Sequence, residues 1–261
     1  TLAIITEITL KLIPKPKHKQ TYMGIFSDVT SAMNAVFKSL ASGANPVAME
    51  FLDSLVIKAL REKLNVDLPA TAGAILVGDV DGNLEDEVKF QLDTLEKSFM
   101  ENGATSFLIA RDTTHAKELW FARKNASPAV TMFGTKKLNE DISVPRSKLP
   151  EALEEIYKIG AKYGMQVPCF GHAGDGNIHV NVMVKDKTDE KQMADGHKAI
   201  EEIFQLVVDM GGTLSGEHGI GTSKAPYMSI AFTDAEMNLF KSIKKAFDPN
   251  NILNPFKMGL N

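Results

Sequence analysis

Two glycine-rich stretches carry most of the residues that can do chemistry in this sequence. In the first, His172 and His179 are seven positions apart, with glycines at 171, 174 and 176. Imidazoles at this spacing cannot share one helical turn, but a glycine turn that folds back would bring them together, because glycine tolerates positive φ. Imidazoles suit zinc, manganese or iron. The stretch therefore predicts a metal site, although two histidines alone fit an ordinary turn and strand equally well.

The second stretch, Leu214-Ser-Gly-Glu-His-Gly-Ile-Gly221, adds a carboxylate and another histidine. Glu217 can complete a His, His, Glu ligand set that leaves one coordination position open. His218 can then act as a general base beside that position, and Asp175 is a candidate hydrogen-bond partner for a ligand histidine. A single turn of this kind is more often structural, but the two together favour a divalent metal held by His172, His179 and Glu217.

Strand-like and helix-like patterns interleave along the chain with short connections. We expect strands near residues 22–27, 47–51, 71–80, 106–110, 142–144, 165–170, 178–184 and 213–215. We expect helices over 28–43, 54–64, 84–100, 113–124, 147–163, 188–210 and 233–247. On the strand after the first turn, His179, Asn181 and Met183 share one face. This order predicts an α+β fold, an antiparallel sheet with ferredoxin-like halves covered by helices.

The ends of the sequence predict a division into domains. Residues 1–13 are rich in β-branched side chains and precede Pro14 and Pro16, which indicates a strand followed by an extended exit. The strand pattern is already under way at Thr1, so we interpret the sequence as a piece of a longer protein. We expect residues 1–16 to be the end of a preceding domain and a junction, 17–245 to be the main domain, and 246–261 to be a C-terminal tail.

Composition narrows the class of protein. The 261 residues are 44% hydrophobic and 24% charged, with a net charge of -4 and one cysteine. This charge gives no reason to expect nucleic acid as a partner, and no apolar run reaches the roughly 18 residues of a transmembrane segment. A single cysteine makes an internal disulfide impossible and a reducing compartment the default. We expect a cytoplasmic protein that partners could attach peripherally to a membrane.

Four stretches in order resemble one family. Gly171-His-Ala-Gly-Asp-Gly-Asn-Ile-His179 and Gly216-Glu-His-Gly-Ile-Gly221 resemble the two signatures of the FAD-linked oxidase C-terminal domain. Phe247-Asp-Pro-Asn-Asn-Ile-Leu-Asn-Pro-Phe-Lys257 resembles its tail, and Leu2-Ala-Ile-Ile-Thr-Glu-Ile-Thr-Leu-Lys-Leu-Ile-Pro14 resembles the last strand of its flavin-binding domain, although Ala3 replaces a usual glycine. The family includes the glycolate oxidase D subunit, cytochrome-linked D-lactate dehydrogenase and D-2-hydroxyglutarate dehydrogenase.

The resemblance implies a cap domain over a flavin and the oxidation of a 2-hydroxy acid to a 2-oxo acid, with hydride transfer to FAD. It implies the following roles by position: metal ligands His172, His179 and Glu217; general base His218; substrate-binding residues Arg123, Ser127 and Asn181; and a flavin-facing Asn254. It also implies that residues 1–16 end the FAD-binding domain and that 246–261 return toward it. The expected partners are the small substrate, that flavin-binding domain and an electron-transfer subunit or acceptor.

One departure bears on the substrate. Family members that act on hydroxyglutarate have a lysine where this sequence has Asn139, so a smaller substrate such as glycolate or D-lactate is favoured. No strand–GxGxxG–helix fingerprint is present, and we expect the isolated chain to hold no FAD tightly and to be inactive alone. The residues also leave open a metal-dependent hydrolase using the same ligands, and a non-catalytic, metal-stabilised module.

Overall fold

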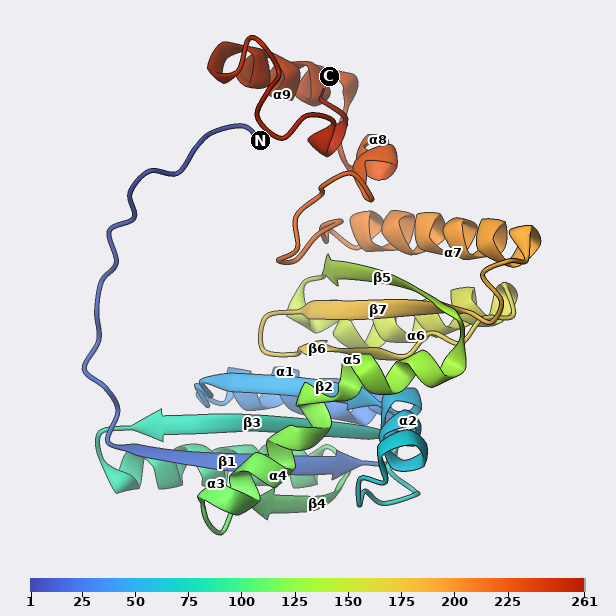
Figure 1. The fold of residues 1–261 in the computed structure, drawn as a ribbon. Coiled ribbons are helices and arrows are strands. Elements are labelled where there is room, and N and C mark those ends of the chain that lie inside the picture. Colours follow the sequence, from blue (N-terminus) through green and yellow to red (C-terminus); the bar gives the residue numbers. More distant parts are fainter. Residues whose placement is uncertain (261) are drawn as a thin grey trace.

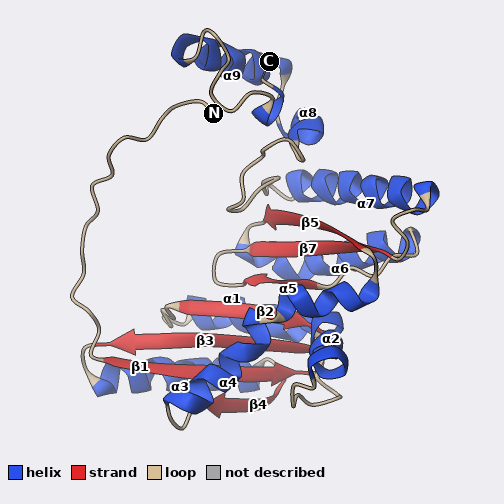
Figure 2. Ribbon diagram, in the orientation of Figure 1, coloured by secondary structure: helices blue, strands red, loops and turns tan. Residues whose placement is uncertain are grey.

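The computed structural model describes residues 1–260, in which seven strands form one antiparallel sheet (Figures 1 and 2). The spatial order is β4-β1-β3-β2-β6-β7-β5, and every pairing between neighbours is antiparallel. The strands are β1 (His18–Phe26), β2 (Ala48–Asp53), β3 (Ala74–Gly82), β4 (Ala104–Ile109), β5 (Lys136–Ser143), β6 (Cys169–His172) and β7 (Asn177–Val184). The predicted α+β fold with an antiparallel sheet is confirmed.

Helices cover both faces of the sheet. One hydrophobic cluster packs α1 (Val29–Ala41), α3 (Glu85–Glu101), α6 (Leu149–Lys162) and α7 (Glu190–Asp209) against one face. A second cluster packs α2 (Ser54–Leu64), α4 (Thr113–Lys124) and α5 (Ala126–Ala129) against the other. The chain ends with α8 (Met228–Ala231) and α9 (Asp234–Phe247), away from the sheet (Figure 1). Within residues 1–260, none of the helices combines the length and the apolar character needed to cross a membrane.

The sheet consists of two similar halves joined at β2 and β6. The order β4-β1-β3-β2 in the first half is that of a ferredoxin-like unit, with α1 and α3 on one face. The second half has the corresponding order β5-β7-β6, with α6 and α7 on the same face. The place of its fourth strand is taken by a single bridge between Ser143 and Thr213. The turn that contains Glu217 and His218 therefore leaves the sheet where a full strand would have continued.

Local sequence signals set several helix boundaries. The side chain of Asp28 accepts a hydrogen bond from the backbone N–H of Ser31 and caps α1. Thr233 and Glu236 form a capping box at the start of α9. These bonds satisfy backbone donors that the first turn of a helix leaves without a partner, so short polar residues before each apolar pattern fix where the helix begins.

Alternation along β7 decides which face carries the candidate site. Ile178, Val180 and Val182 belong to the cluster under α6 and α7. Side chains alternate along a strand, so His179 and Asn181 point to the opposite face, on which α4 and α5 pack. The two glycine-rich turns therefore bring their histidines to the same side of the sheet as Arg123.

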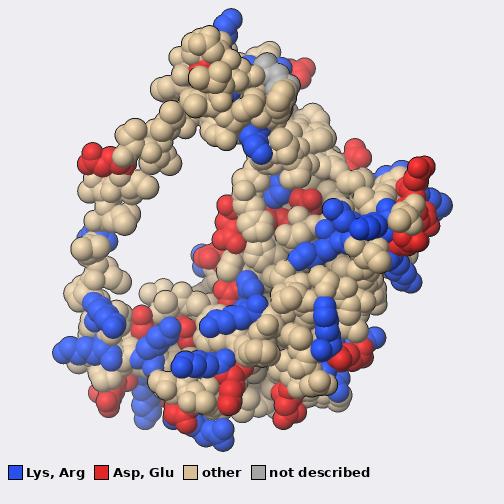
Figure 3. All heavy atoms as spheres, viewed as in Figure 1, with Lys and Arg blue, Asp and Glu red and all other residues tan. Residues whose placement is uncertain are grey.

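Several predicted strands differ in extent from the strands of the structure. Residues 1–13, predicted as a strand, have no regular secondary structure, and this segment stands off from the body (Figure 3). A strand needs a hydrogen-bonded neighbour, and residues 1–260 place none beside it. The predicted strand at 213–215 is reduced to the one bridge at Thr213. The predicted strand at 165–170 begins only at Cys169, after an isolated bridge from Gln166 to Met183.

Candidate active site and metal centre

The turn between β6 and β7 holds the imidazoles of His172 and His179 next to each other. Their ring centres are 5.4 Å apart, with the planes at 78°. Gly176 allows the turn, because its φ is 77° and a Cβ there would lie 2.2 Å from the backbone oxygen of Val144. A side chain at position 176 would displace the turn and pull the two imidazoles apart.

The second turn brings Glu217 and His218 to the same pair. Oε1 of Glu217 lies 3.4 Å from Nε2 of His172 and 3.6 Å from Nε2 of His179. The ring of His218 stacks on that of His179, with centres 5.3 Å apart and planes at 19°. The side chains of Glu217 and His218 are 52% and 49% exposed, whereas that of His179 is 8% exposed. The four side chains thus form a site that is buried on the sheet side and open on the other.

The spacing of three of these groups suits a divalent metal. Two atoms that each lie about 2.1 Å from a tetrahedral ion are about 3.4 Å apart. The separations of Glu217 from the two Nε2 atoms are close to this value, and the three ligand atoms all lie within 4.8 Å of one another. Because Glu217 is half exposed, a fourth position would face the open side.

A second set of three possible metal ligands contains Asp141, His179 and His218. The carboxylate of Asp141 is already occupied, because Oδ1 accepts a hydrogen bond from Asn177 and Oδ2 accepts from the backbone N–H groups of two residues in the second turn. A metal would have to displace these donors. The set with Glu217, whose carboxylate makes contact only with histidines among the described residues, is the better ligand set.

Asp141 connects the second turn to the sheet. Its Oδ2 accepts hydrogen bonds from the backbone N–H of Glu217 at 2.8 Å, from that of His218 at 2.7 Å, and from the hydroxyl of Ser215 at 3.1 Å. Burial opposes ionisation of this carboxyl, but the hydrogen bonds from His218, Asn177 and Glu217 outweigh it and hold its pKa below the usual range. A buried, ionised Asp141 therefore sets where Glu217 and His218 point.

The surroundings of His179 keep its imidazole neutral. Burial lowers the pKa of His179 to about 4, and the nearby positive charge of Arg123 acts in the same direction. At neutral pH the ring therefore carries a lone pair that is free to bind a cation. A metal ligand needs this form of histidine.

Arg123 reaches the histidines through Glu50, a residue of β2. Its Nε donates to Oε2 of Glu50 at 2.7 Å, and Oε1 of the same carboxylate lies 2.6 Å from Nδ1 of His172. The guanidinium carbon lies 5.0 Å from the centre of the Phe170 ring, and this ring is 5.3 Å from that of His179. Arg123 is therefore held beside the candidate metal ligands by one ion pair and one cation–π contact.

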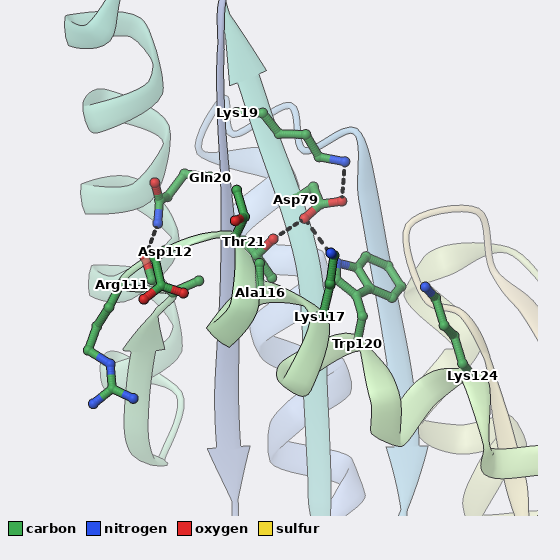
Figure 4. Close-up of a pocket in the computed structure, with 12 residues that line it drawn as sticks. Lys19, Gln20, Thr21, Asp79, Arg111, Asp112, Ala116, Lys117, Trp120 and Lys124 are labelled. Atoms are coloured by element: carbon green, nitrogen blue, oxygen red, sulfur yellow. Dashed lines mark hydrogen bonds and ion pairs between the residues drawn. The ribbon is translucent and has the colours of Figure 1, made fainter.

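The helix that carries Arg123 is itself fixed to the sheet. Nε1 of Trp120 donates to Oδ1 of Asp79 at 3.0 Å, and the hydroxyl of Thr21 donates to the same oxygen at 2.6 Å (Figure 4). Lys19 forms an ion pair with the other oxygen at 2.7 Å. Trp120 lies one helical turn before Arg123, so these bonds set the position from which the arginine extends.

The predicted substrate-binding residues Ser127 and Asn181 lie on the side of the sheet that carries His179 and Arg123. The hydroxyl of Ser127 accepts a hydrogen bond from Nζ of Lys137 at 2.6 Å. Asn181 is fully buried, donates to the backbone oxygens of Pro168 and His179, and accepts from the exposed Asn139 at 2.9 Å. Asn139, directly across the ladder from Asn181, is therefore the amide that faces the open side of the site.

Asn254, which was expected from the sequence to face the flavin, lies away from His172, His179 and His218. It lies in the C-terminal tail and lines a small pocket with Thr1, Ala3 and Ile4. The two ends of the described chain thus meet, as Figure 1 shows.

Sequence reasoning missed the two carboxylates that organise the site, Glu50 and Asp141. It assigned a supporting role to Asp175, which is exposed and has no side-chain contact with either histidine among the described residues. The available signal was a charged residue inside an otherwise apolar strand, because a buried carboxylate needs partners. Glu50 stands between Met49 and Phe51, and such a position indicates a polar network.

Comparison with known proteins decides the family. Residues 15–258 match the family of FAD linked oxidases, C-terminal domain. The chain belongs to this family. It is 35% identical over 258 residues to glycolate oxidase subunit GlcD of Bacillus subtilis, covering 99% of this chain and 54% of that protein. It is 31% identical over 268 residues to D-lactate dehydrogenase of Anaerostipes hadrus, covering 99% of this chain and 56% of that protein.

Two solved structures share the fold of this chain. The 4-ethylphenol oxidase of Gulosibacter chungangensis superimposes with a TM-score of 0.70 at 16% identity, covering 96% of this chain and 55% of that one. p-Cresol methylhydroxylase gives a TM-score of 0.70 at 16% identity, covering 95% of this chain and 54% of that one. At this identity the likeness concerns the fold alone. The chain spans about half the length of the relatives it matches.

Proposed function

We propose that this chain is the substrate- and metal-binding part of an FAD-dependent 2-hydroxy-acid dehydrogenase or oxidase of the glycolate or D-lactate type. One observation carries the proposal: a His, His, Glu set converges beside an arginine whose terminal nitrogens have no hydrogen-bond partner within residues 1–260. A 2-hydroxy acid carries its hydroxyl and its carboxylate on adjacent carbons. A cation site next to a guanidinium can bind both groups at once.

Two cofactors would supply the chemistry. A divalent ion (zinc, manganese or iron) would lower the pKa of the substrate hydroxyl, and FAD would accept the hydride. His172, His179 and Glu217 would hold the ion. Their geometry supports this role because Glu217 lies at the separation of a tetrahedral site from both imidazole nitrogens and one side remains open.

Three residues of this chain would handle the substrate directly. Arg123 binds the carboxylate through its terminal nitrogens and fixes which face of the α-carbon is presented. His218 takes the hydroxyl proton, and its stacking on His179 places it at the open side of the ligand set. Ser127 lies near the remaining substituent, while Asn181 acts through Asn139, to which it is hydrogen-bonded.

The size of the proposed substrate follows from the polar groups beside this site. Asn139 is uncharged and stands where relatives that act on hydroxyglutarate have a lysine. A second carboxylate would thus lack a cation at position 139, and the nearby ammonium of Lys137 already donates to the hydroxyl of Ser127. Glycolate or D-lactate fits this arrangement better than a dicarboxylic hydroxy acid.

We further propose that the flavin is bound mainly by a domain that precedes this chain. Residues 1–16 would be the end of that domain and the junction, 17–245 the cap, and 246–261 a tail that returns toward the flavin, with Asn254 facing it. Ile4, Ile5, Leu10 and Leu12 are all more than two-thirds exposed, as expected of a segment that completes another sheet. An electron-transfer subunit or a soluble acceptor would reoxidise the flavin.

The proposal is tested by expressing the chain with its upstream coding sequence and measuring oxidation of glycolate and of each lactate enantiomer with an artificial acceptor. We expect turnover that Arg123→Lys lowers mainly through a higher KM and that His218→Gln lowers through kcat. The 261-residue chain by itself should be colourless and inactive. Bound flavin in the isolated chain, or undiminished turnover in both variants, would contradict the assignment.

A further inference from the structure

Glu50 is a buried carboxylate whose two oxygens bind two different functional groups. Its side chain is 9% exposed and lies on β2, in the half of the sheet that does not contain the histidine turns. Oε1 is 2.6 Å from Nδ1 of His172, and Oε2 accepts from Nε of Arg123 at 2.7 Å. Because both contacts are short and charge-assisted, the carboxylate fixes the positions of both partners.

The contact with His172 decides which nitrogen faces the ligand set. A carboxylate accepts hydrogen bonds, so Nδ1 of His172 must carry the proton that it donates to Glu50. Nε2, which lies 3.4 Å from Glu217, then presents its lone pair to the open site. This pairing of a carboxylate with a histidine typically fixes the tautomer of a metal-binding imidazole.

The contact with Arg123 decides how the guanidinium is presented. Its Nε is used by Glu50, and among the described residues neither terminal nitrogen forms a hydrogen bond or ion pair. The packing of the guanidinium on Phe170 limits rotation about the remaining bonds. Two parallel N–H groups thus remain for an incoming carboxylate, in the fork geometry that suits it.

We propose that Glu50 is a positioning residue that couples the metal subsite to the carboxylate subsite and so selects acids whose hydroxyl and carboxylate are on adjacent carbons. The inference rests on the proposed function. One rigid carboxylate holds His172 on one side and Arg123 on the other, so the distance between the cation and the guanidinium cannot vary independently. A 3-hydroxy acid, with one more carbon between the two groups, would need a different separation of the cation from the guanidinium than a 2-hydroxy acid needs.

Glu50→Gln separates this role from a simple salt bridge. An amide offers one accepting oxygen in place of two, so only one of the two contacts can persist, and its NH2 group faces the other partner. We expect Zn²⁺ affinity, measured by competition with a chromogenic chelator, to fall about 10- to 100-fold. In the protein with its flavin-binding half, we expect KM for D-lactate to rise and the preference for 2-hydroxybutyrate over 3-hydroxybutyrate to shrink about tenfold.

Asp79→Asn is the matched control. Asp79 is another buried carboxylate on the same face of the sheet, and it holds the same helix through Trp120 without touching His172 or Arg123. We expect this variant to lose stability but to retain Zn²⁺ affinity within about twofold, because the bonds of Asp79 reach the helix of Arg123 and none of the proposed metal ligands. An equal loss of Zn²⁺ affinity in Asp79→Asn and Glu50→Gln would reduce Glu50 to a general structural role and overturn the proposal.

A double variant covers the case in which Glu50→Gln fails to fold because Arg123 is left unpaired. Glu50→Gln with Arg123→Gln removes both charges, and we expect it to fold and still show weak Zn²⁺ binding. Wild-type Zn²⁺ affinity in this variant would overturn the proposal. If the wild type binds Zn²⁺ in a Glu50-dependent way but oxidises no hydroxy acid, the proposed function fails while the control of His172 by Glu50 stands.

Discussion

Asp141 lies directly across the β5–β7 ladder from His179. The same carboxylate binds the backbone of the second glycine-rich turn, 76 and 77 positions further along the chain. One residue therefore holds together the two stretches that supply the candidate metal ligands. Four predictions follow from this arrangement and its surroundings.

Replacing Asp141 by asparagine should loosen the second turn. The amide cannot accept from both backbone N–H groups of the turn and from Asn177, so at least one buried donor loses its partner. We expect the free energy of unfolding to fall by about 2–4 kcal/mol and Zn²⁺ affinity to fall in parallel. Urea unfolding and chelator competition measure the two effects. Asp175→Asn, at an exposed position in the first turn, should change neither, and equal effects in both variants would speak against the role of Asp141.

A methyl group at position 216 should displace the second glycine-rich turn, which carries Glu217 and His218. A Cβ on Gly216 would lie 1.7 Å from Nδ2 of Asn177 and 2.8 Å from Oδ1 of Asp141, so either the backbone of the turn moves or Asn177 gives up its hydrogen bond to Asp141. We expect Gly216→Ala to retain its circular dichroism spectrum while losing most metal binding. Gly174→Ala is the control, because the nearest atom to a Cβ there is 3.8 Å away. Metal binding of normal strength in Gly216→Ala would show that the turn does not carry a ligand.

A positive charge at position 139 should widen substrate choice. Asn139 is exposed beside Asn181 on the site side of the sheet. In Asn139→Lys an ammonium group could pair with a second substrate carboxylate. With the flavin-binding half present, we expect kcat/KM for D-2-hydroxyglutarate relative to D-lactate to rise about tenfold or more. Asn139→Gln should leave the ratio unchanged, and a fall in the ratio for the lysine variant would place the distal group of the substrate elsewhere.

In the metal-free chain, protonation of His179 should lower the free energy of unfolding at acidic pH. The pKa of this residue is about 4 in the folded chain against an ordinary 6.5, so the unfolded state binds more protons between these values. The contribution of His179 is complete above pH 6.5 and is lost as the pH falls toward 4.

We expect the wild type to lose about 3 kcal/mol more than His179→Gln between pH 7 and pH 4, from the conversion of pKa shift to free energy. Urea unfolding in the presence of a chelator measures this difference. Identical slopes of stability against pH in the two proteins would mean that His179 titrates normally in the folded chain.

The positions of many helices could be predicted from local sequence. The predicted helices at 54–64 and 113–124 match α2 and α4 residue for residue, because apolar periodicity and a capping aspartate act within a few positions of each other. The strands were less accurate. Only residues 142–144 of the region around β5 were predicted as strand, since Lys136, Lys137 and Asn139 have low β-propensity and are in the strand because β7 pairs with them.

By itself, the sequence determined which residues had the chemistry of a metal site, because the types His172, His179 and Glu217 and their glycines are local facts. Only the tertiary structure decided that Glu50 and Asp141 are the residues that hold them. Both are buried carboxylates in strands, far along the chain from their partners, and their roles arise from strand register. Register is set by the packing of whole faces of the sheet, so no local pattern specifies it.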